Sequence, residues 1–163
     1  VAQLWHQGRL ARPDVNKLQP LSSSTIRAPY HKPDENPYGE PRAMTSDDIR
    51  QTLDDYASAT RNALKAGFDG VQVHGANGYL IDQFLRDNAN FRTDEYGGSL
   101  ENRLRFPREI VETIGGGAPD GVVGARDGAD LVEQVDDLAA PAHEVSRGEL
   151  GAVRAGPVEH RGE

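Results

Sequence analysis

Apolar and polar residues follow one another along the first 114 positions in the pattern of a strand, a helix and a second strand. Residues 1–6 form a short apolar run that is typical of a strand. Thr45-Ser46-Asp47-Asp48 then has the form of a capping box and predicts a helix that continues to Gly67. The apolar face of this helix comprises Ile49, Leu53, Tyr56, Ala57, Ala63 and Leu64. Gly67 ends the helix and a β-rich run occupies residues 68–74, so the order of elements predicts a parallel α/β unit.

The segment between the first strand and this helix, residues 10–42, is interrupted by proline throughout. Its prolines are Pro13, Pro20, Pro29, Pro33, Pro37 and Pro41. Proline removes a backbone donor, so the segment cannot hold a long helix or a central strand. We expect a long loop, and long ordered loops in compact domains are usually functional. A disordered insertion is the alternative, because the segment has few apolar residues.

Two further helices are expected after the second strand. Residues 79–85 are a short apolar segment that can begin a helix. A longer helix should start at Ser99, with Glu101 in its first turn. Its residues available for burial are Leu104, Ile110, Val111 and Ile114. Pro107 costs roughly 3 kcal/mol in a regular helix interior, so we expect either a kink or two shorter helices.

The character of the sequence changes after Ile114. Residues 115–163 are rich in Gly, Ala and acidic residues and contain no aromatic residue and no lysine. Residues 121–125 are a weak strand candidate, residues 130–140 could form an amphipathic helix, and the remainder has the composition of a disordered tail. The sequence therefore predicts a folded part at 1–114 and a divergent tail of low order at 115–163.

Composition limits the classes of function. The 163 residues carry a formal net charge of −8, which disfavours binding to nucleic acid or to an anionic membrane. The absence of cysteine excludes disulfides, thiolate metal sites and cysteine nucleophiles. No segment resembles a signal peptide or a membrane span, so we expect a cytoplasmic protein whose partner is a small molecule or another protein. The first residue is Val1, inside a strand pattern, and predicts a truncated N-terminus.

Candidate chemistry lies where the second strand ends. His74 stands at the strand's C-terminal edge, and the turn at 75–78 leads to Tyr79, so His74, Asn77 and Tyr79 can face one cavity. Each has a plainer alternative: a structural histidine, a turn residue next to glycine and a core tyrosine. A metal site is not indicated, because no paired ligand spacing occurs among the histidines. These are His6, His31, His74, His143 and His160.

Two motifs together resemble one known family. QLWHQGR at residues 3–9 and HGANGYLIDQFLRDNANFRTDEYGGSLENR at 74–103 are similar to the third-strand and fourth-strand motifs of the old yellow enzyme family. Members of this family are flavin-dependent ene-reductases built on a TIM barrel. The resemblance runs from Val1 to about Ile114. A TIM barrel typically needs about 250 residues, so the resemblance implies a partial (β/α)8 barrel covering about the third to fifth strand units.

The resemblance also implies roles for individual residues. His74 and Asn77 would bind the carbonyl oxygen of an α,β-unsaturated substrate, Tyr79 would donate the proton, and Trp5 would lie near the substrate cavity. Gln3 would contact FMN, with NAD(P)H as the reductant. His6 and Arg9 remain open between the site and the local loop. The rest of the second motif would be scaffold: Arg92, Asp94, Tyr96, Gly97, Gly98, Glu101, Asn102 and Arg103.

A noncatalytic remnant or an interaction segment is the alternative function. The phosphate site of such barrels follows strands seven and eight, and no matching residues are present here. Because flavin affinity is distributed over many contacts, we expect weakened FMN binding. An incomplete barrel also leaves strand edges unpaired, which predicts self-association.

Overall fold

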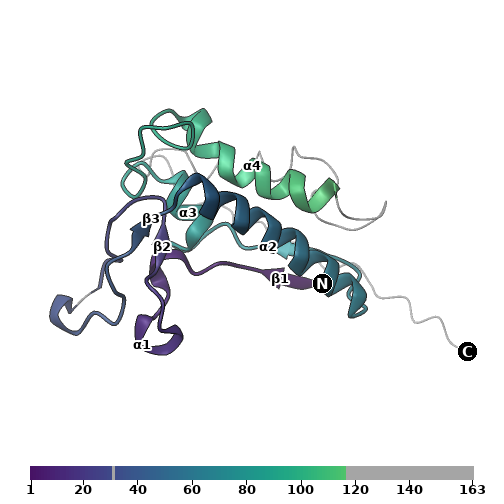
Figure 1. Cartoon of the computed structure of the whole chain (residues 1–163), viewed down its shortest axis with the longest axis horizontal. Coiled ribbons are helices and arrows are strands. Elements are labelled where there is room, and N and C mark those ends of the chain that lie inside the picture. The colour runs from purple at the N-terminus through teal and green to yellow at the C-terminus, as the bar shows by residue number, and fades with distance from the viewer. Residues whose placement is uncertain (31, 117–163) are drawn as a thin grey trace, which may run out of the picture.

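The computed structural model describes residues 1–30 and 32–116 (Figure 1). Its longer elements are β1 (Ala2–Leu4), α2 (Ser46–Lys65), β4 (Val71–Val73), α3 (Leu80–Leu85) and α4 (Leu100–Gly116). Between β1 and α2 lie a 3-10 turn (Gly8–Leu10), α1 (Pro13–Asn16), β2 (Leu21–Ser22), a second 3-10 turn (Pro33–Glu35) and β3 (Arg42–Ala43). The expectations for residues 121–125, 130–140 and the C-terminal tail lie outside the described residues.

The predicted parallel α/β unit is confirmed. β1 pairs in parallel with β4, and the register places Gln3 opposite Gln72 and Leu4 opposite Val73. α2 makes the crossover between the two strands, lies over β1 and runs beside α4 (Figure 1). The His74 N–H donates to the Leu4 carbonyl at 2.9 Å, so the pairing extends to the end of both strands.

The core lies on the helix side of this two-stranded sheet. Ala2, Leu4 and Val73 pack against a cluster drawn from the helices. The fully or nearly buried members are Met44, Ile49, Tyr56, Ala63, Val71, Leu80, Ile81, Phe84, Leu85, Leu104, Phe106, Ile110 and Ile114. Side chains alternate along a strand, so Gln3 and Trp5 lie on the opposite face of the sheet. Trp5 is 50% exposed there.

The start of α2 is fixed by the predicted capping box. The Thr45 hydroxyl accepts from the Asp48 N–H at 3.2 Å, and the Asp48 carboxylate accepts from the Thr45 N–H at 2.7 Å. Arg42 donates to both oxygens of the same carboxylate, at 2.6 and 2.9 Å. The hydrogen bonds from the Arg42 guanidinium hold the pKa of Asp48 well below its ordinary value. This cap joins the end of the proline-rich segment to the first turn of the helix.

The end of α2 is fixed by backbone geometry at Gly67. Gly67 has a φ of 90°, which places it in the left-handed region that glycine tolerates. Its N–H donates to the Leu64 carbonyl at 3.0 Å, and the Phe68 N–H donates to the Ala63 carbonyl at 3.1 Å. These are the two hydrogen bonds of a Schellman motif. The chain thereby turns from the helix into β4 within a few residues.

The expectation of a long loop at residues 10–42 is confirmed, since its elements have four residues at most. β2 and β3 pair in parallel, Leu21 opposite Arg42 and Ser22 opposite Ala43, and close the segment at its base. Three serines after Leu21, Ser22 to Ser24, are buried, although the sequence is polar there. The segment is therefore anchored to the domain and is not a separate insertion within the described residues.

The expected second helix begins where predicted, but it is a single helix. The Ser99 hydroxyl accepts from the Asn102 N–H at 3.2 Å ahead of α4. Pro107 lies inside α4, so the alternative of two shorter helices is wrong. Pro107 is buried, and Phe106 and Ile110 beside it are 0% exposed. Burial of these side chains against α2 and α3 compensates for the hydrogen bond that the proline ring removes.

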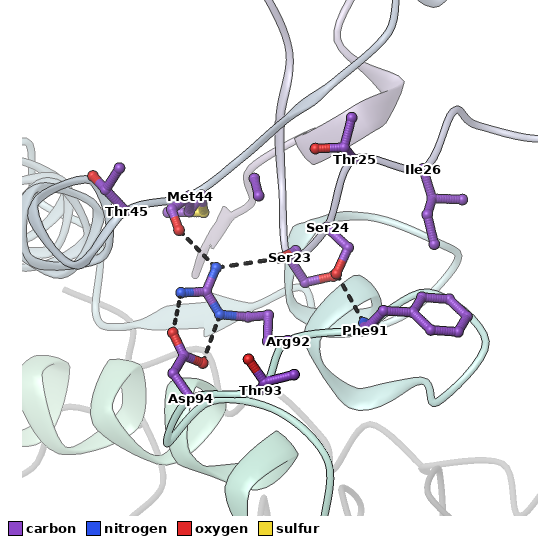
Figure 2. A pocket seen from close by; sticks show the side chains of 11 residues that line it. Ser23, Ser24, Thr25, Ile26, Met44, Thr45, Phe91, Arg92, Thr93 and Asp94 are labelled. Atoms are coloured by element: carbon purple, nitrogen blue, oxygen red, sulfur yellow. Dashed lines mark hydrogen bonds and ion pairs between the residues drawn. The ribbon is translucent and has the colours of Figure 1, made fainter.

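The segment between α3 and α4 has the scaffold role predicted for the second motif. Arg92 donates to the carbonyls of Met44 at 2.6 Å and Ser23 at 3.2 Å and forms a forked pair with Asp94 (Figure 2). Its guanidinium also lies 5.8 Å from the centre of the Phe84 ring. One side chain thus joins three chain segments distant in sequence.

The turn that follows Arg92 is equally constrained. A Cβ at Gly97 would lie 2.3 Å from the Arg92 carbonyl oxygen, so only glycine fits. The Asn102 amide donates to the Gly97 carbonyl at 2.9 Å, and Arg103 donates to the carbonyls of Leu85 and Gly98 at 2.7 and 2.6 Å. The side chains of Asn102 and Arg103 therefore donate hydrogen bonds to backbone carbonyls within the fold.

We predict that Asp48→Ala lowers the free energy of unfolding by about 1 kcal/mol near neutral pH, the usual value of a helix cap. The folded pKa of Asp48 is depressed, so its contribution is present above the unfolded value of about 3.9 and is lost as the pH falls through the folded value. The difference between the two proteins should shrink below about pH 4. Urea unfolding followed by far-UV circular dichroism measures it. Asp54→Ala, at an exposed position of α2, is the control, and an equal loss there would contradict the prediction.

We predict that Arg92→Lys lowers the free energy of unfolding by about 2 kcal/mol, because an ammonium group cannot reproduce the fork that serves Asp94 and two carbonyls. The Arg92 side chain is 10% exposed, so water cannot replace these contacts freely. Arg105→Lys is the matched control, since exposed Arg105 donates to one carbonyl, that of Glu95. Unfolding curves of equal midpoint for the two variants would refute this account.

Candidate functional site

Three of the sequence-predicted site residues form one aromatic cluster. The Trp5 ring lies 4.7 Å from the Tyr79 ring and 6.1 Å from the His74 ring, measured between centroids. The His74 and Tyr79 rings are 5.2 Å apart and meet edge to face. These separations lie within the range in which aromatic rings attract one another. The structure therefore brings Trp5 into contact with Tyr79, which lies 74 positions later in the sequence.

The parallel strands place this cluster. Trp5 follows β1 and His74 follows β4, and the carboxyl ends of parallel strands meet at the same edge of a sheet. Tyr79 reaches the same edge because the turn at 75–78 returns the chain beside the first strand, where the Leu80 N–H donates to the His6 carbonyl at 3.0 Å. Active sites of α/β barrels are built at this edge.

His74 carries the polar atom that the cluster leaves free. Its Nε2 is buried and has no hydrogen-bond partner among the described residues. A buried polar atom without a partner costs free energy, so this nitrogen is poised for an oxygen or nitrogen atom of a bound molecule. Trp5, half exposed, forms the wall next to it.

Asn77 shares the turn with Tyr79, but its side chain is placed differently. It is exposed, it has a φ of 61°, and within residues 1–30 and 32–116 its amide makes no hydrogen bond. The left-handed backbone agrees with the turn role considered from the sequence. The backbone places Asn77 beside the aromatic cluster without joining it to the rings.

Gln3 lies on the sheet face that also carries Trp5. Its side-chain amide is exposed and donates to the Gln72 amide oxygen across the sheet at 3.0 Å. An amide offers two donors and two acceptor lone pairs, so most of its hydrogen-bonding capacity remains available. Beside β1, a hollow of about 290 Å³ opens between the strand and α2. It is lined by Gln3, Leu4, Trp5, His6, Thr52, Asp55, Tyr56 and Ala59.

His6 and Arg9, which the sequence left open, make contacts typical of loop support. The His6 Nδ1 accepts from the Gly8 N–H at 3.0 Å. Burial lowers the pKa of His6, and the charge of Asp55 opposes that shift. Burial likewise lowers the pKa of Arg9, whose Nη1 donates at 3.5 Å to the Ile26 carbonyl.

A second and larger cavity among the described residues is not the site predicted from the sequence. It has a volume of about 620 Å³ and is lined by Ser23, Ser24, Thr25, Ile26, Ala43, Met44, Thr45, Phe91, Arg92, Thr93 and Asp94 (Figure 2). None of the predicted site residues lines it. The Arg92 guanidinium at its wall is already engaged by Asp94 and two carbonyls, so it is not free to bind an anion.

Two residues that bear on the site were missed from the sequence. Residues 79–85 were treated as an apolar segment, yet Asp82 and Gln83 within it are buried and contact the turn at 75–78. An acid and an amide side by side in an otherwise apolar run were the available signal.

Tyr56 was assigned to the core correctly, but its buried hydroxyl has no partner among the described residues, and burial raises its pKa to about 12.

Metal-binding clusters and membrane-spanning helices are both absent from the part of the chain that the structure describes. Within residues 1–30 and 32–116, no group of three or more His, Asp or Glu side chains is arranged to hold a metal ion. In the same part of the chain, no helix is long and apolar enough to cross a membrane.

Several known proteins similar to this chain are named as reductases. The putative 12-oxophytodienoate reductase 5 of Oryza sativa subsp. japonica is 50% identical over 120 residues, 71% of this chain and 31% of that protein. 12-Oxophytodienoate reductase 1 of the same organism is 48% identical over 116 residues, 69% of this chain and 30% of that protein. The chain thus spans about a third of the length of the curated relatives it matches.

Solved structures agree with the sequence relatives. An old yellow enzyme homologue from Zymomonas mobilis is 52% identical, with a TM-score of 0.65 over 69% of this chain and 33% of that chain. Morphinone reductase in complex with tetrahydroNAD is 40% identical, with a TM-score of 0.66 over 74% of this chain and 36% of that chain. These neighbours are TIM-barrel old yellow enzymes, so the predicted partial barrel is confirmed.

The family match is longer than the motifs indicated. Residues 1–139 match the model of the NADH:flavin oxidoreductase / NADH oxidase family. The resemblance therefore extends past Ile114, where the motif comparison placed its end, although the domain boundary at that residue stays a prediction. The two motifs, the parallel strand pair with its aromatic cluster and the relatives all agree, and the chain belongs to the NADH:flavin oxidoreductase / NADH oxidase family.

Proposed function

We propose that this chain is part of an FMN-dependent NAD(P)H oxidoreductase that reduces activated alkenes such as α,β-unsaturated carbonyl compounds. The observation that carries the proposal is the cluster of Trp5, His74 and Tyr79 at the carboxyl ends of two parallel strands, where the His74 Nε2 has no partner among the described residues. Reductases among the relatives support the reaction class, and the relative solved with tetrahydroNAD supports a nicotinamide reductant.

The residues present fit a flavin on the sheet face opposite the helices. Gln3 is exposed on that face and keeps unused donors and acceptors, which suits the pyrimidine edge of an isoalloxazine. Trp5 and His74 lie at the end of the same two strands. FMN, when bound, would supply the hydride, because no protein side chain donates one.

Four side chains have the remaining roles in the proposed reaction. His74 donates a hydrogen bond from Nε2 to the substrate carbonyl oxygen, where negative charge grows as an enolate forms. Asn77 supplies a second donor from the neighbouring turn. Tyr79 gives its phenolic proton to the α carbon, from the face opposite the hydride donor. Trp5 packs on the substrate and excludes water from the side of the cavity that it forms.

Other expectations from the sequence remain proposals. We place the boundary of the folded part at Ile114, and we propose a cytoplasmic location with a small-molecule substrate as partner. The outer edge of β1 has no partner strand within the described residues, which supports self-association. The alternative function, a noncatalytic remnant or interaction segment, makes a different prediction about flavin.

We predict saturable binding of FMN to the purified chain, measured as quenching of flavin fluorescence, and a three- to tenfold weaker affinity for Gln3→Ala, about the effect of one lost hydrogen bond. Gln51→Ala, an exposed amide on α2, is the matched control and should bind FMN as the parent does. Protein that stays colourless and leaves flavin fluorescence unchanged supports the noncatalytic remnant.

We predict that His74→Ala and Asn77→Ala slow alkene reduction in a complete barrel, made by joining this segment to the remainder of a relative. Loss of one oxyanion donor lowers the rate by about 10²- to 10³-fold and weakens phenol-type ligands. Tyr79→Phe removes the proton but keeps the ring, so alkene reduction should fall while ligand affinity changes little.

Stopped-flow measurement separates the two half-reactions. Reduction of the flavin by NAD(P)H should persist in all three variants, because none of these side chains is required to deliver the first hydride. Unchanged oxidation by an enone in both Tyr79→Phe and Asn77→Ala would show that the assignment of the site is wrong.

A further inference from the structure

The short helix α3 buries two polar side chains next to the proposed site. All six residues of Leu80–Leu85 are buried, including Asp82 at 4% and Gln83 at 0% exposure. An acid or amide in such a position is costly unless it is fully hydrogen-bonded. The partners of Asp82 and Gln83 therefore indicate what these residues do.

Both side chains hold the backbone of the same residue, Gly78, one on each of its two peptide groups. The Asp82 carboxylate accepts from the Gly78 N–H at 2.7 Å, and the Gln83 amide donates to the Gly78 carbonyl at 2.6 Å. Gly78 lies between Asn77 and Tyr79, and both Asn77 and Gly78 have positive φ, 61° and 79°. A positive φ is uncommon for residues other than glycine, although Asn tolerates it better than most, and the two hydrogen bonds to Gly78 help to hold the turn in this conformation.

Gln83 also reaches the other side of the site. Its Oε1 accepts from the Arg9 N–H at 3.1 Å and from the Ser22 hydroxyl at 2.9 Å. A Cβ at Gly8 would lie 2.4 Å from that oxygen, so the loop after β1 passes directly against the amide. This is the loop that begins at Trp5.

We propose that Asp82 and Gln83 are positioning residues that hold the turn bearing Asn77 and Tyr79 in register with the loop that follows Trp5. The inference rests on the proposed function in that the turn carries the proton donor. Its physical reason is that a displacement of about 1 Å at a reacting group can lower a rate by about 10²-fold. Both side chains act through the backbone of Gly78, and Gln83 acts also through the backbone of the loop at Arg9.

The first test uses the unaltered protein and amide hydrogen exchange by NMR. Gly78 and Gly98 are matched, since both are glycines with φ near 80° in turns. Gly78 donates to the Asp82 carboxylate, whereas among the described residues the Gly98 N–H has no acceptor. We expect Gly78 to exchange at least about tenfold more slowly. Equal rates overturn the proposal.

The second test uses two variants and the single tryptophan of the chain, Trp5. Asp82→Ala should speed exchange at Gly78 by at least about tenfold. Gln83→Glu keeps the acceptor for Arg9 and Ser22, but a carboxylate cannot donate to the Gly78 carbonyl. We therefore expect its turn to loosen and acrylamide to quench Trp5 fluorescence more strongly, because the Tyr79 ring that packs on Trp5 moves.

Two controls break neighbouring contacts without touching Gly78. Arg86→Gln removes the ion pair of Asp82 with an arginine that is 45% exposed, and Ser22→Ala removes one donor to Gln83. Both should leave Gly78 exchange and Trp5 quenching as in the parent. Variants that match these controls overturn the proposal, and if Asp82→Ala does not fold, Gln83→Glu and the parent measurement still decide it.

The readouts need neither flavin nor alkene. A complete barrel, made as described for the proposed function, that has a fixed Gly78 turn and reduces no alkene refutes the proposed function alone. Alkene reduction that persists in Gln83→Glu with a loosened turn refutes the positioning role alone.

Discussion

The parallel pairing of β1 with β4 is the constraint on which the rest of the structure depends. Its register places Gln3 beside Gln72 on one face and Leu4 beside Val73 on the other. A slip of one residue would exchange the faces, bury the glutamines among the helices and turn the apolar side chains to the open side. The register also aligns the two strand ends, so that Trp5 and His74 meet.

The helices secure this register from one side only. α2 must cross from the end of β1 to the start of β4, and its length is set at one end by the Thr45–Asp48 cap and at the other by Gly67. α4 then packs on α2 through Ile110 and neighbouring residues, despite Pro107. The helix that connects the two strands, α2, and the helix that packs on it, α4, thus both lie within the described residues. The opposite face of the sheet carries polar and aromatic side chains.

The helices and strands could be predicted because their sequence signals are local. The site could be predicted only in part, because it depends on contacts between residues that are far apart in the sequence. The capping box and Gly67 act within a few residues, so the sequence predicted both ends of α2. The alternative of two shorter helices at Pro107 was wrong, because the cost of the proline is local but its compensation comes from burial against other helices. The meeting of His74 and Tyr79 followed from their spacing, and that of either with Trp5 followed from the family motif. The support from Gln83 could not be predicted, since its partners lie 61 and 74 residues away in sequence.

The same distinction between local and distant contacts explains how a third of a barrel can hold an ordered set of site residues. Tyr79 is oriented by its own turn, by the Leu80 hydrogen bond to the His6 carbonyl and by stacking on Trp5, all within two strand units. A flavin is different, because its phosphate and ring contacts come from many strands of a barrel. We therefore expect Tyr79 and His74, the proposed proton donor and carbonyl-binding residue, to keep their geometry more readily than a bound cofactor keeps its affinity. On the proposed function, the order of Tyr79 and His74 and the strength of cofactor binding are physically separable, because only the second requires the barrel to close.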